Sequence, residues 1–188
     1  MPQAFPKIAV FCGTHSGNGR CYEALARSVG RLLAEAGLEL VYGGGSLGLM
    51  GVMADAALEH GGEVTGITTR QLAGWEQAHR RLTRLEIVDA MAERKRRLLE
   101  LADGFLVLPG GFGTLDELFE ALAQEQLAWL SGEAVPRPVA ILDGQGFYRH
   151  LREHLALAVR EGFLRPELLE RVHFVETPEA AMALFVRP

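Results

Sequence analysis

The stretch GFLVLPGGFGTLDELFE, residues 104–120, contains three kinds of sequence in succession. Residues 104–109 are a short apolar run rich in β-forming side chains, which predicts a strand. The Gly-Gly-Phe-Gly that follows predicts a turn. From residue 114 to residue 130, apolar side chains recur with helical spacing, which predicts a helix. A strand, a glycine turn and a helix in this order are the repeating unit of a parallel α/β fold.

The same alternation extends in both directions. Six more short apolar runs predict strands, at residues 7–12, 38–42, 63–67, 84–88, 139–143 and 172–176. Helical patterns lie between them, at residues 21–36, 49–60, 91–102, 147–161 and 178–185, and residues 68–81 read as a loop with about one helical turn. The strands lack polar alternation, as expected when helices cover both faces of a sheet. We therefore expect one Rossmann-like domain over residues 1–188, with a parallel sheet of about seven strands.

Composition excludes several classes of protein. The 188 residues are 48% hydrophobic and 23% charged, as in ordinary globular proteins. A net charge of −5 argues against a nucleic-acid partner, and no apolar run is long enough to predict a membrane span. Two cysteines, Cys12 and Cys21, are too few for a secreted disulfide framework, and the first residues show no signal-peptide pattern. The expected location is the cytoplasm.

The first glycine-rich turn is YGGGSLGLMG, residues 42–51. Its glycines match the G-x-G-x-x-G spacing of dinucleotide-binding proteins, but the match follows the second strand, and the third strand ends in Thr68-Thr69 without a ribose-binding acid. One interpretation is a tight turn that lets a helix pack closely. The interpretation we favour is a turn in which Gly44 and Gly45 face the phosphate or ribose of a ligand.

The second glycine-rich turn begins PGGFGTLDE, at residue 109. Gly110, Gly111 and Gly113 leave backbone N–H groups uncovered, which suits an anion. Thr114 either caps the helix or reaches a phosphate with its hydroxyl. Glu117 has two interpretations as well, because Thr114 to Glu117 is also the spacing of a capping box. A carboxylate beside an anion-binding turn would instead face a sugar.

A third element is MAERKRRLLELAD, residues 91–103. On a helix, its outward-facing charges fit a solvated surface. Arg94 and Lys95 point toward the apolar side, where a charge is costly without a partner. Two cations near the start of a helix, beside the ends of strands, suit a phosphorylated ligand.

Together these segments resemble the Lonely Guy (LOG) family of cytokinin riboside 5′-monophosphate phosphoribohydrolases. The resemblance covers nearly the whole chain and includes VFCGTHSGN at residues 10–18, the glycine turn within residues 40–58, MAERK at 91–95 and the family's P-G-G-x-G-T-x-x-E motif at 109–117. An older label for the family is possible lysine decarboxylase, although nothing in the sequence resembles a pyridoxal-phosphate site. Ala92 stands where the family usually has histidine, and Thr68-Thr69 where it often has Ile-Pro.

The resemblance implies hydrolysis of the N-glycosidic bond of an N6-substituted adenosine 5′-monophosphate or of AMP, releasing cytokinin or adenine and ribose 5-phosphate. Arg94 and Glu117 would be the catalytic pair. The glycines of the second turn and Thr114 would hold the 5′-phosphate, with Lys95 as a further contact. No cofactor is implied. A homodimer is implied, and the helix at residues 114–130 has apolar side chains on more than one side, as expected for a helix that also meets a second subunit.

Two alternatives remain. The same turn and sheet resemble molybdenum-cofactor carrier proteins, which bind a phosphorylated pterin without turnover, but a carrier has no need of Arg94 and Glu117. His150 and His154 match an H-x-x-E-H zinc spacing, but no third ligand is evident, so we expect no metal site.

Overall fold

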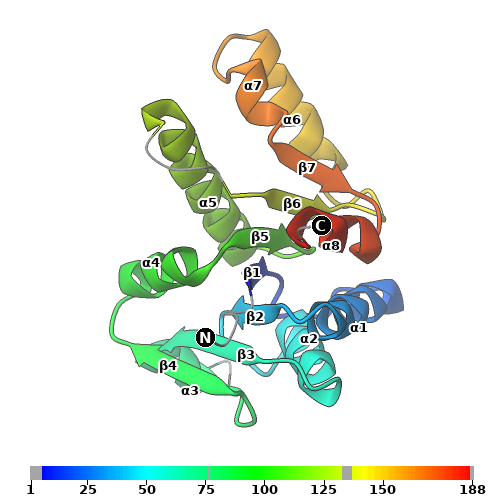
Figure 1. Ribbon diagram of the computed structural model, residues 1–188, viewed down its shortest axis with the longest axis vertical. Helices are drawn as coiled ribbons and strands as arrows, with labels where there is room; N and C mark the ends of the chain where they lie inside the picture. Colours follow the sequence, from blue (N-terminus) through cyan, green and yellow to red (C-terminus); the bar gives the residue numbers. More distant parts are fainter. Residues whose placement is uncertain (1–5, 76, 133–136, 187–188) are drawn as a thin grey trace.

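Seven parallel strands form the centre of the computed structural model, which describes residues 6–75, 77–132 and 137–186 (Figure 1). The strands lie in the order β4-β3-β2-β1-β5-β6-β7. Their bounds are β1 Lys7–Phe11, β2 Glu39–Tyr42, β3 Val64–Thr69, β4 Arg84–Val88, β5 Gly104–Val107, β6 Val139–Leu142 and β7 Val172–Val175. The expected seven-stranded parallel α/β fold is confirmed.

Helices cover both faces of this sheet. Helices α1, α2 and α8 contribute to the buried cluster on one face, and α4, α5 and α6 pack on the other. The helix bounds are α1 Arg20–Glu35, α2 Gly48–Glu59, α3 Arg70–Trp75, α4 Met91–Leu101, α5 Phe112–Ser131, α6 Arg149–Arg160, α7 Pro166–Leu169 and α8 Pro178–Phe185. None of the described helices combines the length and apolar character that a membrane span requires.

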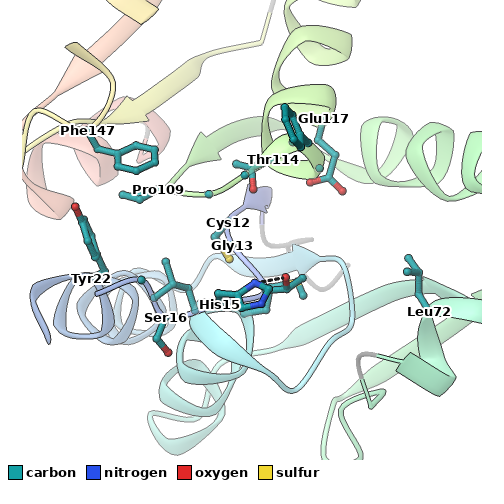
Figure 2. Close-up of a pocket in the computed structure, with 18 of the residues that line it drawn as sticks. Cys12, Gly13, His15, Ser16, Tyr22, Leu72, Pro109, Thr114, Glu117 and Phe147 are labelled. Atoms are coloured by element: carbon teal, nitrogen blue, oxygen red, sulfur yellow. Dashed lines mark hydrogen bonds between the residues drawn. The ribbon is translucent and has the colours of Figure 1, made fainter. Parts of the chain in front are cut away.

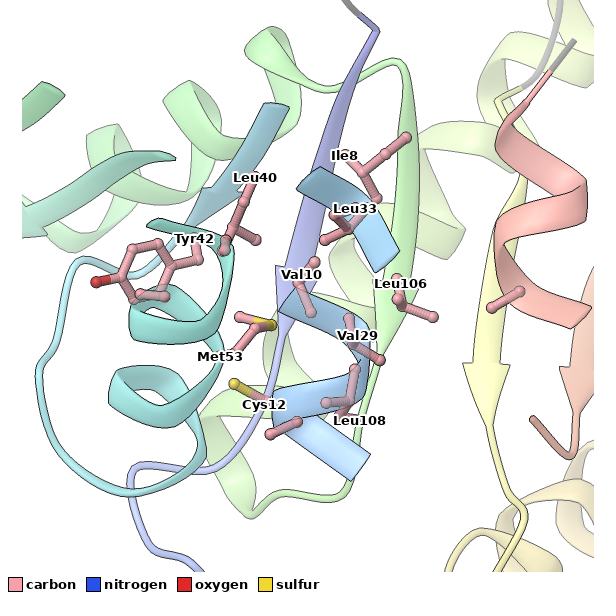
Figure 3. Packing of buried hydrophobic residues seen from close by; sticks show 14 of the residues in the cluster. Ile8, Val10, Cys12, Val29, Leu33, Leu40, Tyr42, Met53, Leu106 and Leu108 are labelled. Carbon is pink, nitrogen blue, oxygen red and sulfur yellow. The ribbon is translucent and has the colours of Figure 1, made fainter. Parts of the chain in front are cut away.

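Strand β1 shows why polar alternation is missing from the sequence. Ile8 and Val10 belong to the cluster under α1 and α2, whereas Ala9 and Phe11 belong to the cluster under α4 and α5. All four side chains are at most 2% exposed. Figure 3 shows Val10 with side chains from neighbouring strands and helices in the first cluster. Both faces of the strand are therefore apolar, as in other two-sided parallel sheets.

The order in which the chain adds strands reverses at β1, the central strand of the sheet. From β1 the chain adds strands on one side as far as β4, then crosses to β5 on the other side of β1. The segments that leave the carboxyl ends of β1 and β5 therefore diverge, and open sheets bind ligands in the crevice formed there. A hydrogen bond of 3.0 Å from Gly13 N to Pro109 O joins the two segments at its base.

Three local expectations need correction. Strand β3 continues to Thr69 and leads directly into α3, because Thr68 and Thr69 pair with Ile87 and Val88 of β4. Helix α5 begins at Phe112 rather than Thr114. The short helix α7, which begins at a proline, was not expected from the sequence.

Candidate active site

A cavity of about 620 Å³ opens at the carboxyl ends of β1 and β5 (Figure 2). Residues 12–17, which follow β1, and residues 109–114, which follow β5, contribute much of its lining. The remainder comes from the first turns of α1, α2 and α4, from α3, from Glu117 on α5 and from Phe147. The volume is in the range of small-molecule sites. The cavity therefore lies where the topology places a ligand.

The second glycine turn delivers the N-terminus of α5 to this cavity. Gly111 is the N-cap residue, and the first amides of a helix have no partner within it. A Cβ on Gly111 or Gly113 would meet no other atom within 4 Å, so both positions border open space. A Cβ on Gly110 would collide with the side-chain oxygen of Thr114. The glycines thus leave the N-terminus of α5 uncovered, a kind of position that favours anions, and admit the Thr114 side chain beside it.

Thr114 does not cap the helix. It is the third residue of α5, it is 3% exposed, and it lines the cavity. The N-cap position at Gly111 has no side-chain hydrogen bond. The capping box considered for Thr114 and Glu117 is therefore not formed, because the helix starts two residues earlier than the sequence pattern predicts.

Arg94 and Glu117 meet at one end of the cavity. Arg94 Nη1 donates to Glu117 Oε1 at 2.8 Å, and Arg94 Nε donates to the carbonyl of Ile67 at 3.0 Å. The two charged side chains are 7% and 13% exposed. A buried pair of this kind must be well hydrogen-bonded, because the loss of either partner would leave an uncompensated charge. The β3 carbonyl and Arg94 together fix the position of the carboxylate.

The first glycine turn makes room for Arg94. A Cβ on Gly43 would collide with the guanidinium Nη2. Gly44 has a φ of +78°, a conformation that favours glycine, and Gly45 forms a β-bridge with Ala78. Neither Gly44 nor Gly45, which we expected at the ligand, is among the residues that line the cavity. The turn therefore affects the cavity indirectly, because it makes room for the Arg94 side chain that lines it.

Lys95 lies outside the cavity as well. Its Nζ is 2.7 Å from Glu120 Oε2 and 3.1 Å from Asp116 Oδ2, both on α5. Hydrogen bonds to Glu120 and Asp116 raise the pKa of Lys95, so its charge is stabilised within this cluster. The sequence predicted correctly that Lys95 faces the protein, but its partners are the carboxylates of the neighbouring helix.

Several lining residues were given no role in the sequence analysis. His15 lies in the segment after β1, and Phe147 lies after β6, where its ring meets Tyr22 edge-on at 6.1 Å between centroids. Such connecting segments have no periodicity, so only the position after a parallel strand could have pointed to them. Cys12 also lines the cavity, and burial, together with the charge of Glu117, raises the pKa of its thiol far above the usual range. Cys12 is therefore a neutral, buried side chain.

The H-x-x-E-H spacing considered in the sequence lies outside the cavity. His150 Nδ1 contacts Glu153 at 2.9 Å on the exposed side of α6. Within residues 6–75, 77–132 and 137–186, no group of three or more histidine, cysteine or acidic side chains is placed to hold a metal ion.

Known sequences match this chain over most of its length. The model of the family described as "possible lysine decarboxylase" matches residues 50–185. A cytokinin riboside 5′-monophosphate phosphoribohydrolase of Rhodococcoides fascians is 39% identical over 182 residues, which are 96% of this chain and 89% of that protein. The chain belongs to the LOG family. An Arabidopsis thaliana LOG phosphoribohydrolase is also 39% identical, with 94% of this chain and 74% of that protein covered.

Solved structures support the same LOG fold. The molybdenum cofactor carrier protein of Chlamydomonas reinhardtii superimposes with a TM-score of 0.72 at 20% identity, with 96% of each chain covered. A molybdenum cofactor binding protein of Rippkaea orientalis gives a TM-score of 0.70 at 20% identity, covering 96% of this chain and 95% of that one. At such identity the likeness concerns the fold alone. Carrier and hydrolase relatives therefore share one framework, and only the site can distinguish them.

Proposed function

We propose that this LOG-family protein hydrolyses the N-glycosidic bond of AMP and of N6-substituted adenosine 5′-monophosphates, releasing the base and ribose 5-phosphate. The observation that carries the proposal is the Arg94–Glu117 pair, held at 2.8 Å inside a cavity that also contains an uncovered helix N-terminus. Relatives at 39% identity over most of the chain are named for this activity. The reaction needs water as its second substrate.

Glu117 is the residue we assign to the reacting sugar. As the bond to the base breaks, positive charge develops on C1′ and the ring oxygen, as in glycoside hydrolysis. A fixed carboxylate stabilises that charge or activates the attacking water. Arg94 keeps the carboxylate in place, because its Nε is anchored on Ile67 O while Nη1 contacts Glu117.

The N-terminus of α5 is the part of the site that we assign to the 5′-phosphate. Its first amides, beside Gly111 and Gly113, favour an anion, and the hydroxyl of the buried Thr114 lies next to them. Glu117 is one helical turn further along α5, so a sugar anchored through its phosphate lies next to the carboxylate. Binding energy from the phosphate would thus orient the anomeric carbon.

The test is incubation with AMP and with adenosine, followed by chromatography of the free base. We expect adenine from AMP. We also expect a kcat/KM for adenosine that is lower by about tenfold or more, the effect of losing charge-assisted hydrogen bonds to the phosphate. Comparable kcat/KM values for the two compounds would remove the α5 N-terminus from the mechanism.

The base is expected on the side of the cavity nearest β3 and α4. Leu72 and Met91 line the cavity from the segment that departs most from the family pattern, and Leu49 and Met50 add apolar surface. Such a wall suits a purine and an apolar N6 substituent. A panel of AMP, N6-isopentenyl-AMP, GMP and CMP tests this assignment. Preferred cleavage of CMP would contradict the purine site, and rejection of the isopentenyl compound would contradict room for the substituent.

The carrier function is the second candidate, because carrier proteins share the fold. A carrier would bind a phosphorylated ligand without consuming it, and AMP would then be recovered intact after incubation. The buried ion pair at the sugar position favours the hydrolase, since a fixed carboxylate beside an anion-binding turn opposes simple phosphate binding.

A homodimer is part of the proposal. On α5, Phe119, Leu127 and Leu130 are 44%, 66% and 47% exposed, although the helix already packs on the sheet with its other side. Exposed apolar side chains gathered on one helix are typical of a subunit contact. Light scattering at micromolar concentration should give twice the chain mass. A monomer at that concentration would overturn this assignment.

A further inference from the structure

The cavity proposed for a phosphorylated substrate poses a question of charge. A nucleoside 5′-monophosphate brings nearly two negative charges. Arg94, a cation of the lining, is already paired with Glu117 at 2.8 Å, and its Nε is committed to Ile67 O. Lys95, which the sequence assigned to the phosphate, is held by Asp116 and Glu120 outside the cavity.

His15 is the remaining lining side chain that can become positive, within the part of the chain that the structure describes. The other titratable groups of the lining are Cys12, Tyr22, Arg94 and Glu117. A thiol and a phenol can add only negative charge. Figure 2 shows His15 on the side of the cavity opposite Thr114, which lies in the first turn of α5.

The segment that carries His15 is held on two sides. Gly13 N donates to Pro109 O at 3.0 Å, which ties the segment to the turn that precedes α5. On the other side, the backbone carbonyl of Thr14 packs so closely on Gly48 that a Cβ there would collide with it. The position of His15 is therefore set by the turn that precedes α5 and by the first residue of α2.

The imidazole also has a partner that tolerates a change of charge. Thr14 Oγ1 and His15 Nδ1 are 3.2 Å apart. A hydroxyl can donate to a neutral ring nitrogen or accept from a protonated one, so the contact survives protonation. In both states Nε2 keeps its hydrogen for another acceptor. Histidine changes charge between about pH 5 and 8, within the range in which an enzyme is assayed.

We propose that His15 is a second phosphate-binding residue, which contacts the substrate's 5′-phosphate as an imidazolium from the side opposite the N-terminus of α5. The inference rests on the proposed function of the cavity. It gives the site a positive charge that the Arg94–Glu117 pair does not supply. It also predicts that affinity for the monophosphate depends on pH.

The surroundings of His15 are compatible with this pH dependence. Across the cavity, α5 contributes Glu117 and α4 contributes Arg94, which compensate each other. Helix α1 contributes Tyr22, and the neutral Cys12 follows β1. The lining residues of α2 and α3 are apolar, and the turn at residues 109–113 bears no charged side chain. The charge on the substrate is therefore the main partner left for an imidazolium.

The test compares His15→Ala with the wild-type protein, using AMP as substrate at about pH 6 and about pH 8.5. We expect KM for AMP to rise about tenfold at the lower pH with kcat nearly unchanged, the effect of losing one charge-assisted contact to the phosphate. A difference that shrinks at the higher pH identifies the contact as one made by the charged imidazole, and a difference that is equal at both pH values contradicts it. The phosphate itself titrates near pH 6, so variants are compared at each pH rather than across pH.

Two further variants sharpen the result. His15→Asn keeps a hydrogen-bond donor without the charge and should match His15→Ala at the lower pH. His150→Ala removes a histidine whose side chain is 79% exposed on α6, outside the cavity, and should leave KM unchanged at both pH values. Competitive inhibition by ribose 5-phosphate should weaken in the two His15 variants to the same extent as AMP binding.

The failure of this proposal can be distinguished from that of the proposed function. Calorimetric titration with AMP measures affinity without turnover. Weaker binding in His15→Ala at low pH supports the phosphate contact even if no adenine is released. Hydrolysis of AMP with equal affinity in all variants would overturn the role of His15 and leave the hydrolase intact. A loss of kcat at unchanged KM would also overturn it, because a phosphate anchor acts on binding.

Discussion

The two glycine turns are similar in sequence and opposite in physical purpose. After β5, Gly111 and Gly113 border open space, and the missing side chains leave the N-terminus of α5 accessible to a ligand. After β2, Gly43 borders the guanidinium of Arg94, and the missing side chain is replaced by another residue's charge. We assign the turn after β5 to ligand binding, whereas the turn after β2 is a socket for the Arg94 side chain.

The two turns meet at a single contact, which explains why the site needs both. Arg94 sits in the socket behind Gly43 and donates to Glu117, which belongs to the helix that the open turn begins. In the proposed mechanism the socket holds the carboxylate in place, while the open turn positions the phosphate. A glycine motif alone cannot show which of these functions it serves, because both need a residue without a side chain.

Glu117→Gln changes the contact at which the two turns meet, and it should have the largest effect on turnover. The amide oxygen can still accept from Arg94, so the fold and AMP affinity should be retained. The negative charge is lost, and we expect kcat for AMP to fall by about 10² or more, the scale of one electrostatic catalytic group.

The matched control is Glu120→Gln, one turn further along α5, where the carboxylate pairs with Lys95 outside the cavity. It should retain turnover. A Glu117→Gln protein with lower thermal stability but wild-type turnover in its folded fraction would show that the carboxylate serves the fold rather than the reaction.

The sequence predicted the fold more completely than the site. Short apolar runs were sufficient to predict the seven strands, because a strand buried on both faces of a sheet consists almost entirely of apolar residues. Helical spacing then located most of the helices between them. Arg94 was recognised because a cation on the apolar side of a helix needs a partner. The partner of Lys95 could not be predicted, because the sequence allowed two: the carboxylates of a neighbouring helix, now seen to be α5, or a phosphorylated ligand. His15 lies in the VFCGTHSGN segment that resembles the family, but a loop residue follows no period, so the sequence did not show that its side chain lines the cavity.

Gly43→Ala and Gly111→Ala test the difference between the two turns directly. In the socket, the new methyl group would displace the guanidinium of Arg94, and we expect about a tenfold loss of kcat, because the carboxylate is no longer held in place. At Gly111, where φ is −101° and no atom lies within 4 Å of the added carbon, we expect the melting temperature to stay near wild type and KM for AMP to rise, because the methyl group enters the space that we assign to the phosphate.

Steady-state kinetics and thermal melts of both variants decide the comparison. Overpacking in a buried region also lowers stability, by about 1–3 kcal/mol, so Gly43→Ala should melt earlier. If Gly111→Ala lost more thermal stability than Gly43→Ala, or left KM for AMP unchanged, the assignment of open surface and socket would be contradicted.

Lys95→Ala should have the smallest effect on catalysis, and it tests whether the phosphate draws on a cation outside the cavity. Lys95 contacts Asp116 and Glu120, whose side chains are 56% and 38% exposed, and exposed ion pairs contribute about 1 kcal/mol or less to stability. We expect a slightly lower melting temperature and an unchanged KM for AMP. A tenfold rise in KM at unchanged stability would mean that Lys95 leaves its carboxylates for the substrate. The charge assigned to His15 would then be supplied from α4, so this variant and His15→Ala should be measured together.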